Sequence, residues 1–75
     1  MKVDEVRASV DQCLTELALA DAIQVNDVTR WADGCYWIDA VDRRGGNLGK
    51  AVRIELMTPS PLTIDATIKG KLEMI

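Results

Sequence analysis

"RWADGCYWIDA", residues 30–40, decides how the middle of this chain folds and contains all three of its aromatic residues. An Asp-Gly pair between two β-prone stretches is the strongest short-range signal for a β-hairpin. The sequence therefore predicts a hairpin that reverses at Asp33 and Gly34, with strands at 28–32 and 35–42.

The faces of this hairpin follow from pairing across a two-residue turn. That pairing places Trp31 opposite Tyr36 and puts Trp37 on the other face. If a helix covers the Trp37 face, Trp31 and Tyr36 form an exposed pair, and exposed aromatic side chains are typical anchors of binding sites. Two alternatives stay open. The two rings could fill the end of a small barrel, or the stretch from Asn26 to Gly34 could form a short helix.

The wider pattern "WADGCYWIDAV", residues 31–41, resembles the first hairpin of the Tudor and SH3-like small barrels. In that family, aromatic side chains on neighbouring strands can form a cage for a cationic side chain. The resemblance implies such a cage for Trp31 and Tyr36, together with Asp33 or Asp39, in a barrel-like sheet. A helix before the hairpin is not part of that family's basic pattern.

Toward the N-terminus, residues 3–22 predict an amphipathic helix. Its apolar residues recur at spacings of three and four, which places them on one stripe: Val3, Val6, Val10, Cys13, Leu17 and Ala20. Asp4 and Glu5 suit the positive end of the helix dipole. We expect the stripe to pack on the sheet, with a helix–helix homodimer as the alternative.

Toward the C-terminus, residues 50–58 predict a third strand and residues 62–74 a fourth. Apolar residues and Gly70 occupy every even position of the last segment, namely Leu62, Ile64, Ala66, Ile68, Gly70, Leu72 and Met74. Such alternation is typical of a strand, here a long one with a bend at Gly70. The exposed edge of so long a strand makes it a second candidate surface for a homodimer.

Together these elements predict one α+β domain over residues 1–75. Its single N-terminal amphipathic helix packs on a curled antiparallel sheet of about four strands, which could be barrel-like. No apolar run approaches the roughly 20 residues that cross a bilayer, and the N-terminus lacks the pattern of a signal peptide. We therefore expect a cytoplasmic protein with no membrane contact.

The residue types argue against an enzyme. The chain has no His, and its two Cys lack a CxxC spacing, so neither imidazole acid–base chemistry nor a zinc site is expected. Asp39 and Asp42 would point to opposite faces of one strand, and "RRGGNLGK", residues 43–50, lacks the Walker spacing. We expect no catalytic residue, no cofactor and no metal.

The net charge of −3 is distributed unevenly along the chain. Residues 1–42 carry nine acidic and three basic side chains, and residues 43–75 carry three acidic and six basic ones. An acidic surface attracts basic protein surfaces. The leading hypothesis is therefore a small non-enzymatic protein-binding domain, an inhibitor, adaptor or regulator that acts on a larger, basic partner protein. The predicted contact residues are Trp31, Asp33, Tyr36, Asp39, Arg43 and Arg44.

Two other functional hypotheses remain open at this stage. The aromatic rings and the basic second half suggest a nucleic-acid-binding module of the small-barrel type; its bases are Arg43, Arg44, Lys50, Arg53, Lys69 and Lys71. A self-assembling structural subunit, joined through residues 62–74, is the third.

Overall fold

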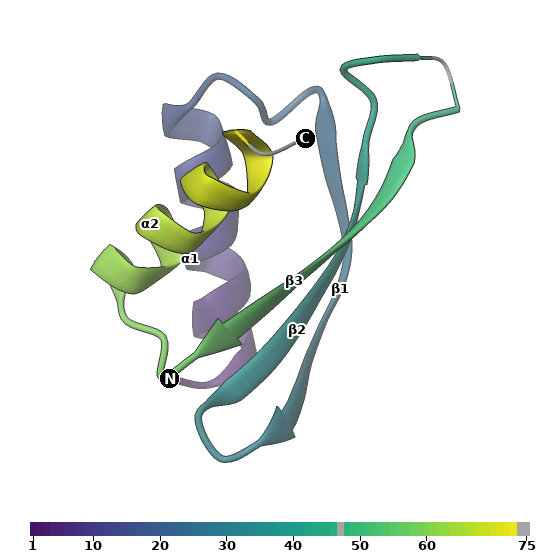
Figure 1. Ribbon diagram of the computed structural model, residues 1–75. Helices are drawn as coiled ribbons and strands as arrows, with labels where there is room; N and C mark the ends of the chain where they lie inside the picture. The colour runs from purple at the N-terminus through teal and green to yellow at the C-terminus, as the bar shows by residue number, and fades with distance from the viewer. Residues whose placement is uncertain (47, 74–75) are drawn as a thin grey trace.

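Two helices lie on one side of a three-stranded sheet in the computed structural model, which describes residues 1–46 and 48–73 (Figure 1). The elements are α1 (Val3–Glu16), β1 (Ile23–Ala32), β2 (Cys35–Asp42), β3 (Lys50–Met57) and α2 (Pro61–Glu73). The strands are antiparallel, in the order β1-β2-β3. The predicted α+β class and antiparallel sheet are confirmed. The sheet is open rather than closed into a barrel, and it has three strands instead of four.

The chain reverses between β1 and β2 at Asp33 and Gly34, as predicted. Gly34 has a φ of +72°, a conformation that favours glycine, and its carbonyl accepts a hydrogen bond from the Thr58 N–H at 2.7 Å. β1 begins at Ile23, earlier than the predicted strand. Residues 27–33 therefore belong to a strand and its turn, and the alternative short helix is wrong.

β1 contains a bulge at Trp31. The register shifts there by one residue: Arg30 pairs with Tyr36 and Ala32 pairs with Cys35, the next residue of β2, so Trp31 is the extra residue. A bulge adds one residue to one strand, so simple alternation assigns the bulged side chain to the wrong face. Trp31 shares a face with Trp37, and the predicted cross-strand pair of Trp31 with Tyr36 is wrong.

The core lies between the helices and one face of the sheet. The sheet contributes alternate residues of β2 and β3, while α1 and α2 contribute one stripe each; the buried side chains include Val6, Val10, Leu14, Tyr36, Ile38, Ile54, Leu56, Ile64 and Ile68. The predicted stripe of α1 is thus used within the chain. Burial, assisted by the nearby Asp65 carboxylate, raises the pKa of the Cys13 thiol to about 11, so this thiol stays protonated at neutral pH.

α1 ends at Glu16, although the apolar pattern predicts a helix over 3–22. Two hydrogen bonds close the helix, from the Leu19 N–H to the Leu14 carbonyl (2.8 Å) and from the Ala18 N–H to the Thr15 carbonyl (3.1 Å). They form a Schellman motif, with Ala18 at a φ of +58° where glycine is usual. Leu19 then packs against the core. Because Ala18 is a good helix former, the end of the helix carries no local signal.

The predicted fourth strand, residues 62–74, is helical through Glu73, and position 74 lies outside the described residues. Ser60 caps this helix. The Thr63 N–H donates to Ser60 Oγ at 3.3 Å, and the Ser60 N–H donates to Thr63 Oγ1 at 2.6 Å. This reciprocal arrangement is a capping box, and proline at position 61 suits the first helical position because it needs no N–H there.

The apolar residues of α2 satisfy two periodicities at once. Ile64, Ile68 and Leu72 are buried and four residues apart, whereas Ala66 and Gly70, between them, are exposed. A spacing of four fits one face of a helix, and the same residues also fall on alternate even positions. The prediction of a strand was wrong for this reason, and residues 62–73 offer no strand edge through which a homodimer could form.

Replacing Gly70 by Ala is expected to stabilise the protein. Gly70 lies inside α2 with nothing within 4 Å of an added Cβ, so the free energy of unfolding should rise by about 0.5–1 kcal/mol. Urea denaturation measures this change in the free energy of unfolding. Gly49→Ala is the matched control with the opposite sign, because Gly49 has a φ of +74° and its Cβ would lie 2.5 Å from Val41 Cγ1. A destabilised Gly70→Ala protein contradicts the helical assignment.

Candidate binding surface on the open face of the sheet

The face of the sheet that points away from α1 and α2 is covered by none of the described elements (Figure 1). We call this surface the open face. Cross-strand pairing and the alternation of burial along β2 and β3 define its members. Those that matter for binding are Asp27, Trp31, Trp37, Asp39, Arg53, Glu55 and Met57.

Two stacked indole rings form the centre of the open face. The ring centroids of Trp31 and Trp37 are 5.8 Å apart with an interplanar angle of 24°. The Arg53 guanidinium lies over Trp37, with its Cζ atom 4.3 Å from the ring centroid. Trp31 remains 48% exposed and Met57 61%. Stacking and the cation–π contact hold the Trp37 ring in place, while Trp31 offers a large apolar surface to solvent.

Carboxylates surround these rings. Asp27 of β1 lies directly opposite Asp39 of β2, and Asp39 lies opposite Arg53 of β3. The Arg53 Nε atom is 3.3 Å from Asp39 Oδ1, so Asp39 has a cationic partner. Among the described residues, the only hydrogen bond to the Asp27 carboxylate comes from the Thr29 hydroxyl, at 3.2 Å. Like charges directly opposite one another are unfavourable in a sheet. Together with Glu55, which lies opposite Trp37, the open face has a surplus of negative charge.

The structure separates the predicted site residues. Trp31 and Asp39 lie on the open face. Tyr36 is 2% exposed in the core, and its hydroxyl donates to the Met1 carbonyl, so the aromatic cage implied by the resemblance to small barrels is not formed. Asp33 lies in the hairpin turn, where its exposed carboxylate accepts a 2.7 Å hydrogen bond from Arg30. Trp37 takes the place expected for Tyr36, and no sequence signal marks the bulge that causes the exchange.

Arg43 and Arg44 lie at the opposite end of β2 from the hairpin. Arg43 donates to Gln24 Oε1 at 2.9 Å. Arg44 holds both carboxylate oxygens of Asp42, with Nη2 2.8 Å from Oδ2 and Nε 3.0 Å from Oδ1, and Nη2 also donates to the Leu72 carbonyl at 3.0 Å. The Arg44 guanidinium thus connects the end of β2 to α2. These hydrogen bonds hold the pKa of Asp42 below its usual range.

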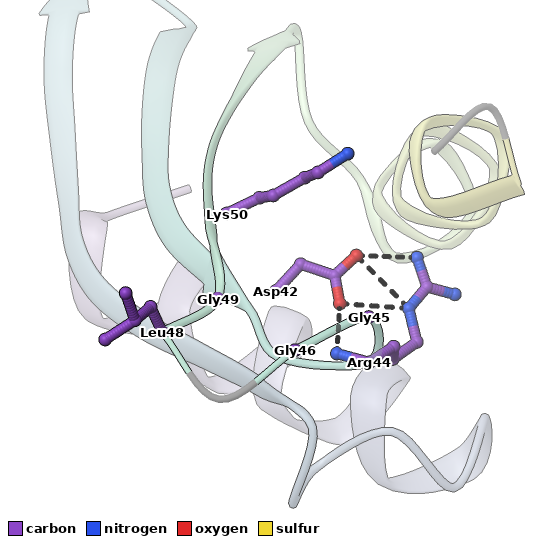
Figure 2. Close-up of a pocket in the computed structure, with 7 residues that line it drawn as sticks. All are labelled: Asp42, Arg44, Gly45, Gly46, Leu48, Gly49 and Lys50. Carbon is purple, nitrogen blue, oxygen red and sulfur yellow. Dashed lines mark hydrogen bonds and ion pairs between the residues drawn. The ribbon is translucent and has the colours of Figure 1, made fainter.

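A cavity of about 740 Å³ adjoins this ion pair beneath the glycine-containing loop (Figure 2). Its described lining comprises Asp42, Arg44, Gly45, Gly46, Leu48, Gly49 and Lys50. Figure 2 shows the Asp42 carboxylate and the Arg44 guanidinium directed at one another, while the Lys50 amine extends away from the loop. The Asp42 and Arg44 charges neutralise one another within the chain, and the pair links the end of β2 to α2.

Two further features were looked for within residues 1–46 and 48–73. No group of three or more Cys, Asp or Glu there is arranged to hold a metal ion, and neither helix is long and apolar enough to cross a membrane. Comparison with family models, curated proteins and solved structures found no match to this chain.

Proposed function

We propose that this protein is a small, non-enzymatic protein-binding domain, and that its open face binds a basic segment of a larger partner protein. The observation that carries the proposal is the exposed Trp31–Trp37 stack beside a surplus of carboxylates on an uncovered sheet. Inhibition, adaptor activity and regulation are the roles such binding can serve.

The tryptophan pair suits the apolar part of this contact. Trp and Arg side chains are enriched among the few interface residues that supply most of the binding energy. Trp31 and Trp37 are already stacked in the free protein, so their rotamers lose little freedom when a partner covers them. Met57, on the neighbouring edge of the same face, adds a flexible apolar side chain.

The carboxylates suit the polar part of the contact. Asp27 and Asp39 face each other with one guanidinium, that of Arg53, to neutralise them. A Lys or Arg side chain of the partner placed between the two carboxylates removes this repulsion, and a second cationic side chain can contact the exposed ring of Trp31. Complementary charge of this kind raises the rate of association more than the final affinity.

The same geometry favours a protein partner over a nucleic acid. The rings that would stack on bases are next to Asp27, Asp39 and Glu55, which repel phosphate. Apart from Arg53, which already binds Asp39, the basic side chains of the second half lie elsewhere: Arg43 and Arg44 are at the end of β2, and Lys69 and Lys71 are on α2.

Octa-arginine should bind the open face, and octa-glutamate should not. We expect octa-arginine to shift the backbone amide NMR signals of β1, β2 and β3 at low salt, and 0.5 M NaCl to abolish the shifts because it screens the charges. Trp31→Ala should weaken binding about fivefold through loss of a cation–π contact. Leu62→Ala, which removes an 82% exposed apolar side chain from α2, should leave binding unchanged.

Three results contradict the proposal. The first is octa-arginine binding that shifts only the signals of α1 and α2, and the second is equal weakening by Trp31→Ala and Leu62→Ala. The third is tighter binding of a single-stranded oligothymidylate than of octa-arginine, which instead supports a nucleic-acid-binding module.

A further inference from the structure

The two edges of the sheet differ in how they are protected. β1 is interrupted by bulges at Asn26 and Trp31, and the Arg7 guanidinium of α1 donates to the Val25 carbonyl at 3.2 Å. Bulges and side chains that cover edge groups are devices that keep a free strand from pairing with another chain. β1 is therefore a poor template for a further strand.

β3 has no such device. It pairs with β2 without a bulge over all eight residues, Lys50–Met57, and every one of those residues is described. Within residues 1–46 and 48–73 no strand pairs with its outer edge, which presents backbone N–H and C=O groups in a regular extended strand. Charged side chains can protect an edge, but on β3 the charges of Arg53 and Glu55 are opposite in sign and two residues apart on the same face.

We propose that β3 pairs with β3 of a second copy of this chain, antiparallel, with Ile54 on the two-fold axis. This register puts Arg53 of each copy opposite Glu55 of the other. The two-fold symmetry therefore gives two Arg53–Glu55 ion pairs. It also pairs Val52 with Leu56 on the side of the helices and Ala51 with Met57 on the open face. The two sheets become one sheet of six strands with all helices on the same side.

Charge selects this register over its neighbours. A two-fold axis at Arg53 places that guanidinium opposite its own copy, and an axis at Glu55 does the same with two carboxylates. Like charges directly opposite destabilise a pair of strands. Only the register centred on Ile54 matches both charges, and Arg53 has enough N–H donors to bind Asp39 of its own chain and Glu55 of the other.

This dimer goes beyond the proposed binding function and does not depend on it. Because the helices of both copies lie on the same side, the two open faces join into one continuous surface. Trp31 lies on β1 and Trp37 on β2, and neither strand takes part in the pairing between the two β3 strands. Trp31→Ala should therefore weaken octa-arginine binding and leave the dimer intact, which makes failure of the dimer and failure of the binding function distinguishable.

Sedimentation velocity between about 10 μM and 1 mM tests the dimer with two charge variants. Wild type should change with concentration from an 8.3 kDa species to one of twice that mass. Glu55→Arg and Arg53→Glu each place like charges opposite one another twice, and each should weaken self-association about tenfold. An equimolar mixture of the two variants should restore the dimer, because one then presents two positive charges and the other two negative ones.

Glu16→Arg on α1 makes the same change of charge away from β3 and should dimerise like wild type. If circular dichroism shows that Arg53→Glu does not fold, the self-association of Glu55→Arg is compared with that of Glu16→Arg. Weaker self-association of Glu55→Arg alone then supports the dimer. A wild-type monomer at every concentration overturns the proposal. So does a dimer that survives Glu55→Arg but is lost in Trp31→Ala, since that dimer uses the open face instead.

Discussion

Ile68→Asp is expected to unfold the protein, whereas Ala66→Asp, two positions earlier, should change the free energy of unfolding by no more than about 0.5 kcal/mol. Ile68 is 1% exposed on the buried side of α2, so the substitution places an unpaired carboxylate in the core. This costs more than about 4 kcal/mol, a large part of the stability of a domain of this size. Ala66 is exposed on the outer side of the same helix.

Thermal unfolding followed by circular dichroism distinguishes the two variants. Ile68→Ala is a milder variant for the same comparison. It should lower the free energy of unfolding by about 3 kcal/mol and still leave a folded fraction that can be measured. A strand over residues 62–74 places positions 66 and 68 on the same face. An equal loss of stability in Ala66→Asp and Ile68→Asp would therefore contradict the helical assignment of residues 61–73.

Arg44→Met should destabilise the protein at pH 7, and by clearly more than Arg43→Met. Asp42 is 5% exposed, and the Arg44 guanidinium binds both of its carboxylate oxygens. Removal of this cation leaves a buried carboxylate without its partner and also removes the hydrogen bond to the Leu72 carbonyl of α2. Arg43→Met is the matched control; its guanidinium makes an exposed contact with Gln24, so we expect a change within about 0.5 kcal/mol.

The effect of Arg44→Met should depend on pH. In the wild type the pKa of Asp42 is lowered by Arg44, so this pair contributes stability above about pH 4 that is lost as the pH falls through the lowered pKa. In the variant the buried carboxylate has lost the cation that binds it directly and keeps only the more distant charge of Lys50, so protonation relieves it. Urea denaturation between pH 7 and pH 3 should show the difference between the two proteins narrowing toward low pH. A constant difference, or an equal loss in Arg43→Met, contradicts a buried ion pair.

Most of the hairpin and the third strand could be predicted from sequence. The turn at Asp33 and Gly34 is encoded by adjacent residues whose backbone preferences act locally, and the strand that follows the glycine-containing loop is close to its predicted place. The start of α2 also has a signal in the local sequence. Ser60, Pro61 and Thr63 carry a helix cap, which is a local signal for the start of a helix.

The candidate site was only partly predictable. Trp31 and Asp39 were identified from residue type and lie on the open face, but a simple count of alternate residues exchanged Tyr36 for Trp37. The exchange results from one bulge, which shifts the face of a single residue and leaves no mark in the local sequence. Arg53 and Asp27 were not among the predicted contacts, because their importance depends on cross-strand neighbours.

By itself, the sequence determined where the chain turns, that α1 forms, and that the protein combines helix with antiparallel sheet, because these features depend on preferences of residues close together in the chain. Only the tertiary structure decided that residues 61–73 are helical, that α1 stops at Glu16, and that both helices cover the same face. The physical reason is that Ile64, Ile68 and Leu72 satisfy the periods of a strand and of a helix equally. The choice between them depends on which arrangement buries these side chains against α1 and the sheet.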